Sequence, residues 1–104
     1  MKRTTLFITS LVLMVGCSKP INDETLIHKG GLKYHPDTKE LYSGKVFKNR
    51  MGGKKEFEGS YKDGKEDGLW TKWYKKGQME REETYKDGNI VSYKRWNEDG
   101  SVKE

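Results

Sequence analysis

Polar and apolar residues alternate along the second half of the chain. One face of the run Lys54–Tyr61 carries the residues at every second position, which are Lys55, Phe57, Gly59 and Tyr61. A period of two is typical of a strand with one face toward a core. The same reasoning predicts six strands, at Lys45–Arg50, Lys54–Tyr61, Leu69–Tyr74, Gln78–Tyr85, Asn89–Trp96 and Ser101–Glu104.

Turn signals separate these runs. Asp-Gly pairs occur at Asp63-Gly64 and Asp87-Gly88, where tight hairpin turns need positive φ at both central residues. A second kind of turn contains a glycine at Gly53, Gly77 or Gly100. Alternating strands and turns favour an antiparallel meander. A helix over residues 76–86 is an open alternative, since that segment has helix formers, but its glycine argues against a helix.

An internal repeat underlies this pattern. Residues 44–64 align without gaps to residues 68–88, with nine identities that include the YKDG at the end of each copy. A third, partial copy follows at residues 91–104, with the offset reduced by one residue. Repeats occupy about 44–67, 68–90 and 91–104, and each supplies aromatic residues at matching places. The repetition therefore predicts a sheet that grows by one hairpin at a time, held by a ladder of cross-strand aromatic pairs.

The first residues have a different character. Lys2 and Arg3 precede a short apolar run, which ends at Gly16 and at the only cysteine, Cys17. This is typical of a secretory signal peptide, and the run is too short to span a membrane as a helix. The sequence MVGC resembles the lipobox of bacterial lipoproteins, although Met14 stands where leucine is usual.

The lipoprotein resemblance implies cleavage between Gly16 and Cys17 and acylation of Cys17, which would anchor the chain in a bilayer. Ser18 favours the periplasmic side of the outer membrane if the host is Gram-negative. We therefore expect a signal peptide at 1–16 and a lipidated cysteine with a polar tether at 17–25. Residues 26–104 would form an all-β domain, an antiparallel meander of stacked hairpins.

Composition supports a thin sheet. The chain contains no alanine and many glycines, lysines, glutamates and aromatic residues, which disfavours helix. Few apolar residues are available for a core, so we expect a partly single-layered sheet. The chain carries a formal net charge of +5, part of which lies in the expected signal peptide.

The middle repeat, GLWTKWYKKGQMEREETYKDG, resembles the variant MORN repeat of the YwqK-like family of antitoxin components. The resemblance implies a repeat scaffold without catalytic groups, and an antitoxin-like or immunity-like role toward an exported partner. Aromatic and arginine side chains dominate protein-binding surfaces. The candidate binding surface therefore consists of Trp70, Trp73, Tyr74, Arg81, Tyr93 and Trp96.

Other chemistry finds little support in the sequence. His28 and His35 lack a third ligand at suitable spacing, so we expect no metal, and no cofactor or catalytic group is indicated. Aromatic residues interleaved with lysines would suit single-stranded nucleic acid, but an exported protein argues against it. Two functions remain: a lipid-anchored protein-binding module, or a structural envelope lipoprotein that contacts lipid or glycan without a dedicated protein partner.

Overall fold

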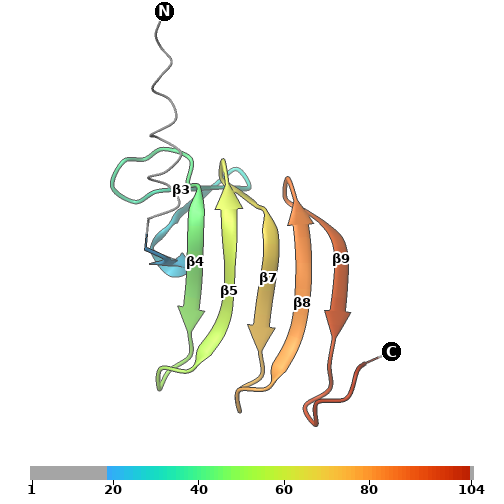
Figure 1. Ribbon diagram of the computed structural model, residues 1–104. Coiled ribbons are helices and arrows are strands. Elements are labelled where there is room, and N and C mark those ends of the chain that lie inside the picture. Colours follow the sequence, from blue (N-terminus) through green and yellow to red (C-terminus); the bar gives the residue numbers. More distant parts are fainter. Residues whose placement is uncertain (1–18, 104) are drawn as a thin grey trace, which may run out of the picture.

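The computed structural model describes residues 19–103, which form a curved sheet and a small separate hairpin (Figure 1). The strands are β1 (Ile21–Asn22), β2 (Ile27–Lys29), β3 (Leu32–Tyr34), β4 (Gly44–Asn49), β5 (Lys55–Lys62), β6 (Lys65–Glu66), β7 (Gly68–Trp73), β8 (Met79–Lys86) and β9 (Asn89–Arg95). The order in the sheet is β1-β4-β5-β7-β8-β9, with β6 also on β5, and β2 pairs with β3. All pairings are antiparallel except that of β1 with β4.

The all-β expectation is confirmed for the described residues. Five of the six predicted strands are present, with ends shifted by at most one residue. The alternative helix over residues 76–86 is wrong, since β8 occupies most of that segment. The sixth strand, Ser101–Glu104, is reduced to a single bridge between Trp96 and Val102. The expected signal peptide, Gly16 and Cys17 lie outside the described residues.

The two Asp-Gly turns have the predicted geometry. Asp63 and Gly64 have φ of 50° and 80°, and Asp87 and Gly88 have φ of 51° and 83°. Positive φ at both central residues matches the right-handed twist of the flanking strands. Asp99-Gly100 has the same letters but belongs to the other kind of turn, because only its glycine has positive φ.

The second kind of turn recurs with the same hydrogen bonds in all three repeats. The amides of Gly53, Gly77 and Gly100 each donate to the carbonyl three residues earlier, on Arg50, Tyr74 and Asn97. Side chains then link one repeat to the next. Arg50 Nη2 donates to the Trp73 carbonyl at 2.7 Å, and Tyr74 Oη donates to the Trp96 carbonyl at 2.7 Å. Equivalent positions thus tie neighbouring hairpins together at one end of the sheet.

A β-bulge follows the same lysine position in each of the first two hairpins. Lys48 pairs with Phe57 but Asn49 pairs with Lys55, which leaves Glu56 as the extra residue. The register shifts in the same way after Lys72. The period of two predicts that Lys55 and Phe57 share a face. The bulge interrupts the alternation between them, so they lie on different faces. The Lys55 ammonium pairs with Glu58 at 2.6 Å on the face opposite Phe57.

The drop in repeat offset also has a structural cause. Beyond the turn at Gly64, the pairing slips by two residues between Tyr61–Glu66 and Glu58–Thr71. Beyond Gly88, it slips by only one residue, as Thr84 pairs with Ser92 whereas Tyr85 pairs with Ile90. The third copy therefore needs one residue fewer to bring its aromatic strand into the sheet.

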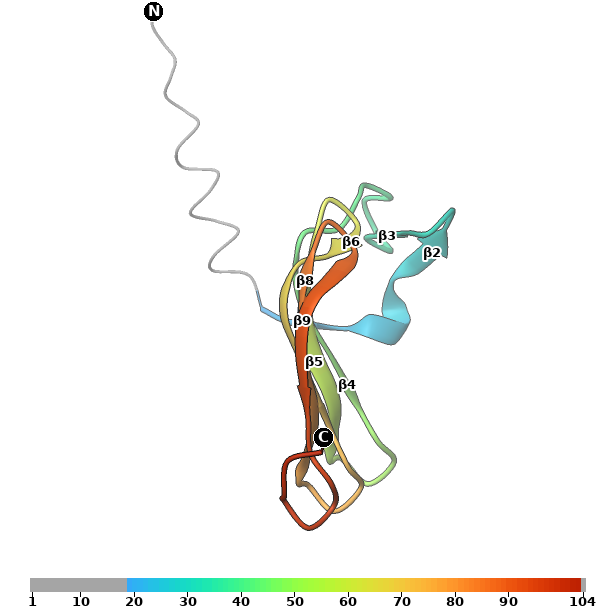
Figure 2. The same cartoon turned by 90° about the vertical axis from the view of Figure 1, so that its right-hand side faces the viewer.

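The core lies at one end of one face. Leu26, Tyr42, Val46 and Tyr61 are its buried members, and Val46 is only 1% exposed. Residues 23–42 cross this face, whereas the rest of the sheet is a single layer (Figure 2). We call the side that carries Val46, Trp70 and Tyr85 the covered face, and the side that carries Phe47, Leu69 and Thr71 the open face. The expected thin sheet is confirmed for the described residues.

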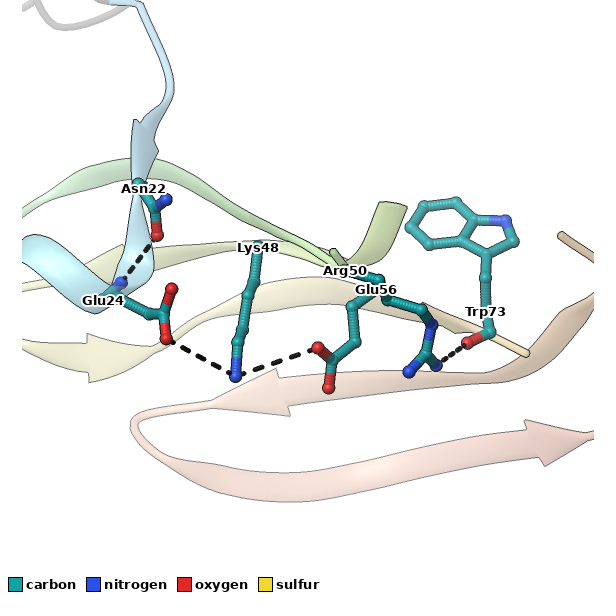
Figure 3. Close-up of polar contacts among 6 residues, drawn as sticks. All are labelled: Asn22, Glu24, Lys48, Arg50, Glu56 and Trp73. Atoms are coloured by element: carbon teal, nitrogen blue, oxygen red, sulfur yellow. Dashed lines mark hydrogen bonds and ion pairs between the residues drawn. The ribbon is translucent and has the colours of Figure 1, made fainter. Parts of the chain in front are cut away.

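Residues 21–25 belong to this folded unit, although the sequence assigns them to the tether. Ile21 and Asn22 pair with Val46 and Phe47, and Asp23–Thr25 form a 3-10 turn capped by the Asn22 side chain. Lys48 Nζ lies 3.8 Å from both Glu24 and Glu56, which draws the turn onto β4 (Figure 3). Polar composition alone does not reveal these pairings, because they depend on a strand more than twenty residues later in the chain.

Tyr61 offers a test of this docking. Its hydroxyl donates to Asp23 Oδ1 at 2.9 Å, and burial, followed by Asp23, raises its pKa. We expect Tyr61→Phe to lower the free energy of unfolding by about 1–2 kcal/mol. In the wild type an unfolded tyrosine ionises near its ordinary pKa of 10.0 and the folded one only at higher pH, so stability falls as the pH rises above that value. Urea unfolding across this range should show a shallower fall in Tyr61→Phe, and an unchanged slope would contradict the assignment.

No helix within residues 19–103 combines the length and apolar character that a bilayer span requires.

Candidate functional site

Trp70 is the centre of the aromatic ladder on the covered face. Its ring centroid lies 5.1 Å from that of Tyr61, 5.8 Å from Phe57 and 6.1 Å from Tyr85. Its indole N–H donates to the Ser60 carbonyl at 3.1 Å. The predicted ladder is therefore present, and Trp70 holds the sheet together rather than standing free at the surface.

Trp73 and Trp96 occupy equivalent positions at the turn end of the sheet and are half-buried. A lysine ammonium lies over each ring: Lys55 at 5.7 Å from the Trp73 centroid and Lys94 at 5.4 Å from the Trp96 centroid. Tyr74 is bound through its hydroxyl to the Trp96 carbonyl. These three predicted residues thus gather near the turns, where their polar contacts are internal to the protein.

Arg81 and Tyr93 lie across the outer strands. Arg81 faces Arg95 on β9 and Lys72 on β7, and its Nε is 3.6 Å from Glu83 Oε2. Tyr93 is 65% exposed, with the Arg95 guanidinium 5.5 Å from its ring centroid. The six predicted binding residues therefore do not form one surface. Trp70 lies in the ladder, Trp73, Tyr74 and Trp96 lie near the turns, and Tyr93 lies on the outermost strand.

Each face carries a shallow hollow. On the open face, a groove of about 690 Å³ contains Phe47 and Leu69 together with Lys19, Lys45 and Lys55. On the covered face, a hollow of about 300 Å³ lies against Trp70, Glu83 and Tyr85. Tyr85 donates to Glu83 Oε1 at 3.2 Å, and burial together with this carboxylate raises the Tyr85 pKa. The acids and bases of this hollow largely neutralise one another.

The edge strand β9 adds exposed apolar residues that are not among the six predicted binding residues. Every residue of β9 is exposed, including Ile90 at 47% and Val91 at 61%. Val102, which forms a single bridge with Trp96 just after β9, is 50% exposed. Only Tyr93 of this group was predicted. Ile90 and Val91 are apolar, which is the signal in the sequence that could have identified them. Apolar residues in a predicted strand are expected to be buried, however, so the sequence gives no sign that these two are exposed.

His35 makes structural contacts, and His28 lies on β2. His35 Nδ1 accepts from the Asp37 amide at 3.0 Å, and its ring packs 6.1 Å from Tyr42. Within residues 19–103, no group of three or more histidine, cysteine, aspartate or glutamate side chains is arranged to hold a metal ion. Aromatic, basic and apolar side chains lie along the sheet in this part of the chain.

No protein-family model, no curated protein and no solved structure matches this chain.

Proposed function

We propose that this chain is a lipid-anchored protein of the bacterial envelope, whose MORN-like repeat sheet binds another protein and catalyses no reaction. In this proposal Cys17 carries the lipid, and the partner is an exported protein. An immunity role toward an exported toxin is the specific version that the family resemblance implies. No nucleic acid or cofactor takes part.

One observation carries the protein-binding proposal. Seven large apolar side chains are strongly exposed in the described part of the chain. Four of them follow one edge of the sheet: Ile90, Val91 and Tyr93 lie on β9, and Val102 lies in the segment bridged to Trp96 just beyond the end of that strand. Exposed apolar side chains that gather along one part of a surface, rather than scatter, are typical of interaction sites. The lysines and arginines around them suit a polar rim.

Site-specific photo-cross-linking in intact cells tests the proposal. A photo-reactive residue at Val91 should capture one protein in stoichiometric yield. Met51, which is fully exposed at 101% in the first repeat's turn, gives a matched control that should capture none. A Cys17→Ser chain should lose both membrane retention and capture, because the anchor places it beside its partner.

A second candidate function follows from the open face. Lys19, Lys45 and Lys55 surround Phe47 and Leu69 in a groove, which suits contact with an anionic lipid or glycan. In that case Val91 and Met51 would capture the same abundant envelope proteins in similar yield. Lys45→Glu and Lys55→Glu would then reduce binding to envelope preparations without removing any specific protein. This outcome would make the chain a structural envelope lipoprotein.

A further inference from the structure

Each aromatic strand of the repeat is normally followed by a turn and a partner strand. β4 is followed by the turn at Gly53 and pairs along its length with β5, and β7 is followed by the turn at Gly77 and pairs with β8. β9 is followed by the turn at Gly100, which has the same hydrogen bonds. Within residues 19–103, however, pairing on the outer side of β9 extends only to Val102 and Lys103.

The hydrogen-bonding groups on this outer side can be assigned. The Trp96 amide donates inward to Glu80 on β8, whereas the Arg95 carbonyl accepts outward from the Lys103 amide at 2.8 Å. Backbone groups of successive residues point to opposite sides of a strand, so the amide and carbonyl of Tyr93 also point outward. Among residues 19–103, no strand pairs with these outward groups of Tyr93, which form a template for one more strand.

The charge of this edge differs from that of the two earlier repeats. In the first repeat, Lys48 faces Glu56 on the strand paired with it. Arg95 holds the position of Lys48 and Lys72 in the third repeat, but Lys103 stands where those repeats have a glutamate. Lys94 adds a third positive charge on the opposite face of the strand, where its cross-strand neighbour on β8 is Glu82. None of these three bases forms an ion pair with another described residue.

A second copy of the chain fits this edge poorly. In an antiparallel pair of β9 edges centred on Tyr93, Ile90 and Val91 of each copy would have to lie beside Trp96 and Arg95 of the other, where Val102 and Lys103 already cover the edge. The opposite edge of the sheet, β4, is covered by β1 at Val46 and Phe47. Head-to-tail addition of β9 to β4 of another copy is therefore obstructed as well.

We propose that the outer edge of β9 binds an extended acidic segment of the partner protein as an additional antiparallel strand. The backbone of Tyr93 provides hydrogen bonds, and Ile90, Val91 and the Tyr93 ring contact alternate apolar side chains of the incoming strand. Arg95, Lys94 and Lys103 select acidic residues at the end nearest the turn. Strand addition of this kind takes affinity from the main chain and specificity from side chains. The inference rests on the proposed protein-binding function and identifies its site and its partner's chemistry.

The test uses the full chain in detergent and a short peptide that alternates glutamate with valine. Titration followed by fluorescence anisotropy should show binding, and a peptide with lysine in place of glutamate should bind at least about tenfold more weakly. Tyr93→Pro removes the outward N–H and leaves the inward ladder, whereas Tyr93→Ala removes the ring and keeps the N–H. We expect Tyr93→Pro to bind the acidic peptide about tenfold more weakly than Tyr93→Ala.

A second variant keeps the test decisive if Tyr93→Pro does not fold. Lys94→Glu with Arg95→Glu should reverse the preference between the two peptides, whereas Lys75→Glu in the second repeat's turn should not. Equal binding of both peptides, or binding that neither variant changes, would overturn the proposal. So would self-association in sedimentation that Tyr93→Pro abolishes, since a second copy would then occupy the edge.

The two proposals can fail separately. If Val91 captures a partner in cells and Tyr93→Pro leaves that capture unchanged, the partner binds elsewhere and only the strand-addition proposal fails. If the acidic peptide binds as expected but no protein is captured in cells, the edge is competent to bind and the proposed protein-binding function fails.

Discussion

Trp70→Ala is expected to lower the free energy of unfolding by about 3 kcal/mol, the largest effect that we predict for a single side chain. Trp70 contacts three other aromatic rings and donates a hydrogen bond to the Ser60 carbonyl. It also packs against the buried cluster that joins the N-terminal segment to the sheet. Its removal takes away packing beside the buried cluster, where residues 23–42 form a second layer over the sheet. A domain of this size is stable by only about 5–15 kcal/mol, so the loss is large.

Urea denaturation followed by circular dichroism measures this effect without dependence on the fluorescence of Trp70. Trp73→Ala is the matched control, because Trp73 is also a half-buried tryptophan on β7, but its ring lies near the Lys55 ammonium and is in none of the aromatic pairs that Trp70 makes. We expect it to cost about 1 kcal/mol. Equal losses in the two variants would contradict the central position that we assign to Trp70.

Gly59→Ala is expected to destabilise the domain by about 2 kcal/mol for a different reason. A Cβ at this position would lie 2.0 Å from Trp70 Cδ2 and 2.3 Å from its Cε2. The backbone of Gly59 is extended, so the constraint comes from the indole ring above it and not from φ. Either the ring or β5 must shift, and both are fixed by neighbouring contacts.

A double-mutant cycle isolates this cause. In a Trp70→Ala background the ring is absent, so Gly59→Ala should cost less than about 1 kcal/mol. Ser60→Ala, at the next position of β5, controls for the propensity of alanine in a strand. A cost of Gly59→Ala that persists without the Trp70 ring would show that strand propensity, not steric overlap, is responsible.

Local chemistry explains why the sheet itself was predictable. Asp-Gly at residues 63–64 and 87–88 adopts the turn that its positive φ values allow, and each turn sets the pairing of the residues next to it, Lys62 with Lys65 and Lys86 with Asn89. The repeat then required Tyr61 and Tyr85 to fall at matching places, and both lie in the ladder. These features depend on residues close together in the chain, and sequence analysis can therefore find them.

The candidate site was less predictable, because it depends on what covers each position. Six residues were chosen for their type, yet Trp70 proved to be structural, and the exposed neighbours of Tyr93 were not among them. The links from Arg50 and Tyr74 to the next repeat were also missed. Arginine and tyrosine are different residue types, so the sequence does not show that they have the same role. In the stacked hairpins both side chains donate to a backbone carbonyl at the equivalent position of the next repeat.

Val46, Trp70 and Tyr93 show where the boundary lies. The repeat makes them equivalent, and the sequence by itself determined that each lies on the same face of successive hairpins. Only the tertiary structure decided their exposure: Val46 is 1% exposed, Trp70 is half-buried and Tyr93 is 65% exposed. The reason is that burial requires neighbours on every side. Residues 21–42 supply them at one edge of the sheet, and nothing within residues 19–103 does so at the other.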